Sequence, residues 1–366
     1  MSPEDSESSE PATLRGAMLG TGSIAQHHLL AWRDLPGVDI VALANRTRWR
    51  AARLGETFGV GEEHIYSDYT ELLAKESLDF VDIATAPLVH CEQVLAAAER
   101  GLHVFCQKPF ATSTAEARTM VEACEGARVR CIVNENWRWR SYYRRLKQMV
   151  DDQIVGQPRY ARFCFHGDDV LPRPDGGLPA LFTRQVYTAE MPRLILLEWG
   201  IHLVDVLRFL FGDIRAVFAS MARISPLVQG EDLAVVQMRF ANGMVGLIDI
   251  SWASATRPER RMTRGQVDPF WIEGDRGTIQ LDPFQDDALL VTSLDGNVVV
   301  QPAHPHTSAA GVYQESYLKT QSHFIDCLRS GRPAENEARD NLKTLAAVMA
   351  AYESAERGEV VHIAAD

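Results

Sequence analysis

The stretch LRGAMLGTGSIA, residues 14–25, joins a short apolar run to the pattern G-x-G-x-x-A. Gly20 permits a tight turn after a strand, and Gly22 lets the backbone approach a pyrophosphate. Ser23 and Ile24 would open the next helix, whose first N–H groups bind that anion. The pattern is weak alone, but with a strand before it and a helix after it, it predicts a dinucleotide-binding Rossmann domain.

The region around this loop, residues 14–136, alternates short apolar runs with helical patterns. Strands are predicted at 15–19, 39–44, 80–84, 103–106 and 129–133. Helices are predicted at 24–34, 48–58, 70–75, 90–100 and 114–125. Such alternation is typical of a parallel sheet covered by helices, so 14–136 is predicted to be an α/β Rossmann domain with a doubly wound parallel sheet.

The remainder of the chain, 137–366, has a different pattern. After a helix at 142–150, strands are predicted at 158–165, 214–221, 233–240, 244–252, 270–273, 278–281, 288–293 and 298–301. Asn242-Gly243 is a strong hairpin turn between two of them. We expect an α+β domain for substrate binding and oligomerisation, with a large, mostly antiparallel, open-faced sheet. One face would be covered by a helix at 196–211 and the helices from 317 onward, and the uncovered face predicts a homodimer or homotetramer.

Composition restricts the partners of the chain. The net charge of −12 over 366 residues argues against nucleic acid. The aromatic and basic cluster at 137–147 is interpreted as a solvated helix face with one or two members turned into a site. No stretch is apolar enough to span a membrane, and the polar, acidic start, 1–13, predicts a disordered tail on a cytoplasmic protein. Six cysteines without a C-x-x-C pair fit a reducing compartment, and His304-Pro305-His306 lacks a third ligand, so no metal is expected.

The end of the second predicted strand bears on cofactor choice. An Asp or Glu there would hold the ribose 2′-hydroxyl of NAD, but this chain has Asn45-Arg46. Losing the carboxylate removes repulsion toward a 2′-phosphate, and Arg46 or Arg48 would bind that phosphate or stack on adenine. The sequence therefore favours NADP over NAD. The alternative is that Arg46 is simply a solvated residue at a helix start.

Further motifs extend over nearly the whole chain. They are ATAP (84–87) with His90, GLHVFCQKP (101–109), NWR (136–138), EWGIH (198–202) with Asp205, and EGDRG (273–277). With the Gly20 loop they are highly specific, and the chain resembles the Gfo/Idh/MocA family, named after glucose-fructose oxidoreductase, inositol dehydrogenase and MocA. The resemblance implies an NAD(P)-dependent oxidoreductase.

Lys108 is the first candidate catalytic residue. The family usually has Glu-Lys-Pro where this chain has Gln107-Lys108-Pro109, and the resemblance implies that Lys108 polarises the reacting hydroxyl or carbonyl beside the nicotinamide. A lysine at the carboxyl end of a parallel strand, before a rigid proline, points into the ligand crevice. Its ammonium offsets charge that develops on the substrate oxygen. Gln107 lacks the usual charge, and we expect it to contact the cofactor.

Glu198 and His202 match the family's second centre, an Asp and a His on a helix. Four residues apart, they would share one helix face. The pKa of an imidazole suits His202 to take the hydroxyl proton as hydride leaves, and Glu198 would orient that ring or bind substrate hydroxyls. The alternative is a core histidine with a structural carboxylate, which is also the role expected of Asp205.

The remaining candidate contacts divide between cofactor and substrate. Thr85, Pro87, His90 and Asn136 are expected to line the cofactor site. Arg138, by resemblance, and His166 and Tyr187, by their predicted positions, are candidate substrate contacts; for the last two, no contact is an equal alternative.

The predicted activity is hydride transfer between nicotinamide and a sugar, polyol or related hydroxy or carbonyl compound. Sugars are the family's commonest substrates, and the candidate residues are polar enough to bind hydroxyls. One alternative is a non-catalytic NAD(P)-binding sensor of the same fold, against which the retained Lys108 and His202 argue. Another is a reductase or dehydrogenase of aromatic diols or tetrapyrroles, which would need a more apolar pocket.

Overall fold

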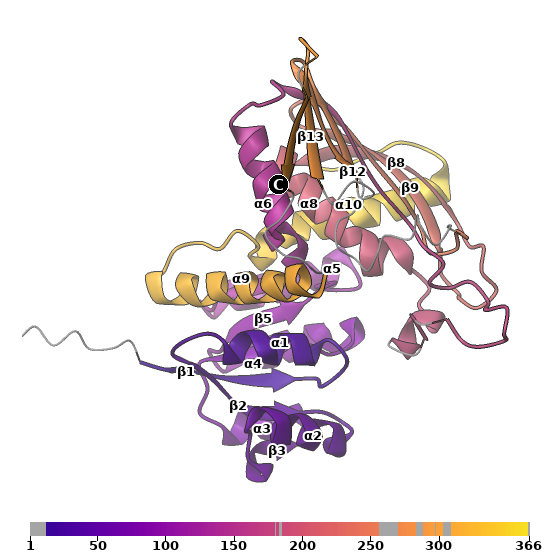
Figure 1. Cartoon of the computed structure of the whole chain (residues 1–366). Coiled ribbons are helices and arrows are strands. Elements are labelled where there is room, and N and C mark those ends of the chain that lie inside the picture. The colour runs from indigo at the N-terminus through magenta and orange to yellow at the C-terminus, as the bar shows by residue number, and fades with distance from the viewer. Residues whose placement is uncertain are drawn as a thin grey trace, which may run out of the picture.

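Figure 1 shows the computed structural model of the chain, which describes residues 12–364 apart from 180, 183–184, 256–269, 283–287, 297 and 303–308. The predicted tail at 1–13 lies mostly outside the described residues, as do His304 and His306. None of the helices in these ranges is long and apolar enough to cross a membrane.

The first layer is a six-stranded parallel sheet in the order β3-β2-β1-β4-β5-β6, which confirms the predicted Rossmann fold. Its strands are β1 (Leu14–Leu19), β2 (Val38–Ala44), β3 (Ile65–Tyr66), β4 (Phe80–Ile83), β5 (His103–Gln107) and β6 (Cys131–Asn134). Its helices are α1 (Ala25–Arg33), α2 (Arg48–Phe58), α3 (Tyr69–Lys75), α4 (His90–Glu99) and α5 (Thr114–Gly126). The strand order reverses between β1 and β4, so a ligand crevice is expected at their carboxyl ends.

The second sheet has nine strands in the order β14-β13-β12-β11-β7-β10-β9-β8-β15. They are β7 (Pro158–His166), β8 (Ile214–Ala222), β9 (Leu233–Phe240), β10 (Val245–Ser251), β11 (Phe270–Gly274), β12 (Gly277–Asp282), β13 (Ala288–Ser293), β14 (Val298–Pro302) and β15 (Val361–His362). Only β7 and β10 pair in parallel, which confirms a mostly antiparallel sheet. The predicted hairpin at Asn242-Gly243 joins β9 to β10.

Two helices, α8 (Ile201–Phe211) and α10 (Ala338–Arg357), cover one face of this sheet (Figure 1). The prediction that all helices from 317 onward lie there is wrong for α9 (Ala309–Ser330), which packs on the Rossmann layer. Phe324 of α9 joins Trp32, Phe80 and Phe105 in one buried cluster. The apolar pattern of a helix shows that one face is buried, but not which sheet buries it.

The basic cluster lies on a 3-10 turn, η3 (Asn136–Trp139), and on α6 (Ser141–Asp151). Arg138 and Arg140 are buried, so two arginines of this cluster turn inward from its solvated face. The guanidinium carbon of Arg140 lies 3.8 Å from the ring centre of Trp137, and that of Arg144 lies 3.6 Å from Trp139. The interleaved aromatic rings therefore serve as partners for the arginines.

Candidate active site

The Gly20 loop has the shape that a pyrophosphate requires. Gly20 has φ +94°, and a Cβ there would lie 2.5 Å from the carbonyl oxygen of Ala84, so only glycine fits. At Gly22 a Cβ would have no heavy atom within 4 Å, so this side of the loop faces open space. Ile24, the N-cap residue of α1, provides no side-chain cap, so no side chain competes with an anion at the start of this helix. The residues present fit a dinucleotide.

The adenosine end of the crevice lies beside the end of β2. The Asn45 amide donates to the carbonyl oxygen of Thr47 at 3.0 Å, and Arg48 forms an ion pair with Glu62. Arg46 is exposed and has no hydrogen-bond or ion-pair partner within the described part of the chain. Of the two arginines considered, Arg46 is therefore the one whose guanidinium is available to bind a 2′-phosphate.

Lys108 follows the last residue of β5 and reaches across to the second domain. Its Nζ donates to the backbone carbonyl oxygen of Glu198 and lies 3.1 Å from Glu198 Oε1. The Lys108 side chain is 12% exposed, and the Lys108-Pro109 peptide bond is cis. Gln107 Oε1 accepts from the backbone N–H of Lys108 at 2.8 Å. The structure thus brings Lys108 and Glu198 together, as expected for residues of one site.

Glu198 lies on a π-helical turn, η5 (Leu196–Gly200), that leads directly into α8. Its Oε1 also accepts hydrogen bonds of 3.3 Å from the Gln185 amide and from the Tyr187 hydroxyl. Burial and the neighbouring Glu198 carboxyl raise the pKa of Tyr187, so the phenol keeps its proton. The second oxygen, Oε2, is buried and has no hydrogen-bond partner among the described residues. A hydroxyl of a bound substrate would satisfy it.

His202 lies on the first turn of α8 and is 5% exposed. Its Nδ1 lies 2.6 Å from Oε2 of Glu135, and its ring stacks on Trp137 with centroids 4.6 Å apart. Burial, with the charges of Lys108 and Arg140, holds the pKa of His202 well below its usual range, so the ring is neutral near pH 7. Glu135 was not predicted from the sequence. The feature that could have indicated it is a carboxylate directly after the last Rossmann strand, next to the candidate residue Asn136.

The residues predicted to contact the cofactor at the other strand ends form hydrogen bonds with other residues of the chain. Thr85 donates to Gln93 at 2.6 Å, and Asn136 donates to Ser316 of α9 at 2.7 Å. His90 is fully buried, with Nδ1 3.1 Å from the Pro109 carbonyl oxygen and Nε2 3.2 Å from that of Thr85. It therefore ties the Thr85 loop to the Lys108 turn, while Pro87 begins the short turn Pro87–Val89 between them.

Two predicted substrate contacts have other partners. Arg138 binds Asp205 with two nitrogens and also reaches Asp340 of α10, so its contacts indicate a structural role like that expected of Asp205. His166 ends β7, with Nε2 2.9 Å from Asp249. Its neighbour Phe165 packs against Trp199 on the helix-covered face. Because side chains alternate along a strand, His166 lies on the open face and is not assigned to the substrate pocket.

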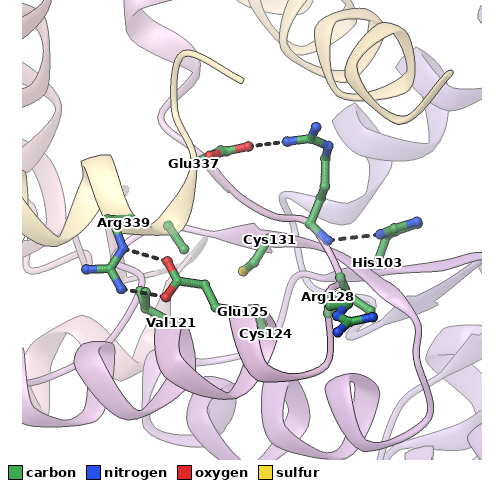
Figure 2. A pocket seen from close by; sticks show the side chains of 11 residues that line it. His103, Val121, Cys124, Glu125, Arg128, Cys131, Glu337 and Arg339 are labelled. Atoms are coloured by element: carbon green, nitrogen blue, oxygen red, sulfur yellow. Dashed lines mark hydrogen bonds and ion pairs between the residues drawn. The ribbon is translucent and has the colours of Figure 1, made fainter. Parts of the chain in front are cut away.

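A cavity of about 340 Å³ lies at the opposite edge of the Rossmann sheet, where His103 and Cys131 begin β5 and β6 (Figure 2). Glu337 pairs with Arg130, and Arg339 pairs with Glu125. These arginines are neutralised by carboxylates, and the chemistry described above lies at the carboxyl ends of the strands. The cavity is therefore not the active site.

Comparison with known proteins agrees with this geometry. Residues 14–135 match the oxidoreductase family with an NAD-binding Rossmann fold, and residues 143–280 match the GFO/IDH/MocA C-terminal domain. D-apiose dehydrogenase of Paraburkholderia graminis is 37% identical over 95% of this chain and 89% of its own, and that of Rhizobium rhizogenes is 36% identical over 96% and 98%.

A solved structure is similar over the same length. An oxidoreductase from Agrobacterium radiobacter in complex with NAD+, L-tartaric acid and magnesium aligns with a TM-score of 0.86 and 35% identity, over 96% of this chain and 98% of that one. Both domains of the chain are covered by these matches. The chain therefore belongs to the Gfo/Idh/MocA family and is an NAD-binding oxidoreductase.

Proposed function

We propose that this enzyme oxidises a hydroxyl group of a sugar or polyol to a carbonyl, reversibly, with D-apiose and related pentoses as the first candidates. The observation that carries the proposal is the meeting of Lys108, Glu198 and His202 beside the cofactor crevice. The similarity to two D-apiose dehydrogenases over almost the full length supports the substrate class.

The three side chains divide the chemistry. When bound, the nicotinamide takes up the hydride that leaves the substrate carbon. Lys108 donates to the reacting oxygen and offsets its developing charge. His202, which is neutral, accepts the hydroxyl proton at Nε2 as the O–H bond breaks, and Glu198 Oε2 accepts a hydrogen bond from a second hydroxyl.

Cofactor choice is proposed to depend on Arg46. The matched domain is NAD-binding, and NAD+ is the cofactor in the similar Agrobacterium radiobacter structure. In this chain Asn45 presents no carboxylate to repel a 2′-phosphate, and Arg46 is free to bind one. We therefore propose that the enzyme accepts both cofactors and prefers NADP.

A substrate panel with a lysine variant tests the proposal. Aldoses including D-apiose, lactones and polyols are assayed with NAD and NADP, and Lys108→Ala is expected to lower kcat on the accepted substrate by at least about 100-fold. Lys75→Ala, an exposed lysine paired with Glu71, is the control. Cofactor titration by fluorescence is expected to show binding in all three proteins. Full turnover of Lys108→Ala would contradict the mechanism, and tight cofactor binding without any activity would favour a sensor.

A further inference from the structure

Glu135 is a buried carboxylate at the junction of the two domains. It follows β6 directly and precedes η3, and its side chain is 0% exposed. Among the described residues, only His202 lies within normal hydrogen-bonding distance of its carboxyl, with Oε2 2.6 Å from Nδ1. A carboxyl group buried this completely with one close partner is costly for a fold, so its retention calls for a role.

The contact decides which nitrogen of His202 is basic. A carboxylate can only accept, so Nδ1 must carry the proton and Nε2 is left with its lone pair. Nε2 has no hydrogen-bond partner among the described residues. If Glu135 were protonated instead, its O–H would donate to Nδ1, the ring proton would move to Nε2, and the base would be lost. The protonation state of Glu135 therefore decides whether Nε2 of His202 can accept a proton.

The orientation of the His202 ring is fixed by its neighbours. Trp137 stacks on one face of the imidazole at an interplanar angle of 5°, and the guanidinium of Arg140 lies on the Trp137 ring. A 180° flip of the ring would keep this stack but place Cδ2 instead of Nδ1 beside Glu135, so the hydrogen bond to the carboxylate is what fixes the flip state. Stacking and the carboxylate together fix both the plane and the tautomer of His202.

Charges on every neighbouring element act on this pair. Burial and Glu198 raise the pKa of Glu135, while Lys108, Arg138 and the nearby side chain of Asn341 of α10 lower it, and the net result is a pKa of about 7. Burial, Lys108 and Arg140 lower the pKa of His202, while Asp205 opposes them. Glu135 therefore titrates near pH 7, and because it is hydrogen-bonded to His202 the apparent pKa belongs to both groups.

We propose that Glu135 is a positioning residue that holds His202 in the Nδ1–H tautomer and compensates the imidazolium that forms when Nε2 takes the substrate proton. The inference rests on the proposed dehydrogenase function, because it assigns a role within that reaction. One proton moves from the substrate hydroxyl to Nε2, and the Nδ1 proton stays between His202 and Glu135.

The kinetic test uses Glu135→Gln, whose amide oxygen still accepts from Nδ1 but carries no charge and does not titrate. In the oxidation direction we expect kcat to fall by at least about 100-fold with KM and the cofactor dissociation constant unchanged. The acid limb of the kcat profile near pH 7 is expected to disappear. Asp82→Asn is the matched control, since Asp82 is also 0% exposed and pairs with a histidine, His28, at 2.8 Å. It is expected to keep the wild-type pH profile.

A second measurement needs neither activity nor a variant of Glu135. Nitrogen-15 NMR of the histidine rings, assigned by comparison with His202→Gln, reports the tautomer of His202 in the wild-type protein. We expect Nδ1–H with an unprotonated Nε2 at pH 8, and a change of the signal through pH 7.

The outcomes separate the two proposals. A wild-type enzyme without activity on any compound of the panel overturns the proposed function. An active wild type with an unaltered pH profile in Glu135→Gln overturns the role of Glu135 alone, and so does an Nε2–H tautomer at pH 8.

Discussion

At the level of single residues, the proposed active site contains groups whose burial lowers the stability of the fold. Glu135, Glu198 and His202 are each at most 5% exposed, and two of their polar atoms, Glu135 Oε1 and Glu198 Oε2, have no hydrogen-bond partner among the described residues. Each such atom loses its hydration on folding. The arrangement is understandable if a substrate later supplies the missing contacts or if the charge is needed in the reaction.

The burial of Glu135 predicts an unusual dependence of stability on pH. Its pKa is about 7 in the folded protein against 4.5 for the free group, so between these values the folded state holds a proton that the unfolded state has released. Stability from this group therefore falls as pH rises from 4.5 to 7, by roughly 3 kcal/mol in total. Glu135→Gln does not titrate, so its stability does not fall with pH for this reason. Urea unfolding at pH 4.5 and pH 8 is expected to show the variant gaining stability relative to wild type at the higher pH, and an equal difference at both values would contradict the burial effect.

Arg46 gives a prediction about cofactor choice. Removing its guanidinium should remove a charge-assisted hydrogen bond to a 2′-phosphate, so Arg46→Ala is expected to weaken NADP binding about tenfold and leave NAD binding unchanged. Arg48→Ala is the matched control, because Arg48 is already paired with Glu62. Fluorescence titration with both cofactors measures the ratio. Tighter binding of NAD than of NADP to the wild-type protein would refute the role of Arg46.

At the scale of elements, periodic patterns were sufficient for the strands and long helices but not for their tertiary partners. The five predicted Rossmann strands all occur, because each is a continuous apolar run, whereas β3 and β15 have two residues each and too little pattern to detect. That Lys108 and Glu198 belong to one site was implied by the family resemblance, and the structure brings them into contact. The pairing of Glu135 with His202 joins positions 67 apart in sequence, and no local pattern indicates it. The π-turn that carries Glu198 was predicted as ordinary α-helix.

That π-turn depends on Gly200. A Cβ at this position would lie 2.8 Å from the terminal methyl carbons of Leu196 and Ile250, so these two fully buried side chains would have to shift. Gly200→Ala is therefore expected to destabilise the fold by about 1–3 kcal/mol and, by shifting Glu198 against His202, to lower kcat. Thermal unfolding and kinetics measure both effects.

Gly126→Ala is the control for this change. Gly126 is the last residue of α5, and a Cβ there would meet nothing within 4 Å. It should leave kcat unchanged and affect stability by less than about 1 kcal/mol. Gly200→Ala with wild-type stability and turnover would show that the turn tolerates a side chain.

In the whole molecule, the two sheets are joined by elements that also position the proposed active-site residues. Helix α9 returns from the second sheet to pack on α1, where the Gln314 amide donates to the His27 carbonyl oxygen at 3.0 Å (Figure 1). Helix α10 is tied to the Rossmann layer by Arg339 and Glu125 (Figure 2). Lys108 comes from one layer, and Glu198 and His202 come from the other. Contacts that fix the layers relative to each other therefore also fix the catalytic geometry.

The open face of the second sheet predicts self-association. Phe218 of β8 and Trp271 of β11 are 40% and 44% exposed, and they alternate with residues that face α8 and α10, so both lie on the face without helices. Apolar side chains on an uncovered sheet face are typical of an interface between copies. Light scattering of the wild-type protein is therefore expected to give a mass above the 40.8 kDa of one chain.

Trp271→Glu would bury a charge in that interface and is expected to shift the protein toward the monomer. Trp49→Glu, which changes a 59% exposed tryptophan on α2, should leave the mass unchanged. A monomeric wild type, or equal masses for the two variants, would show that the open face does not form the interface.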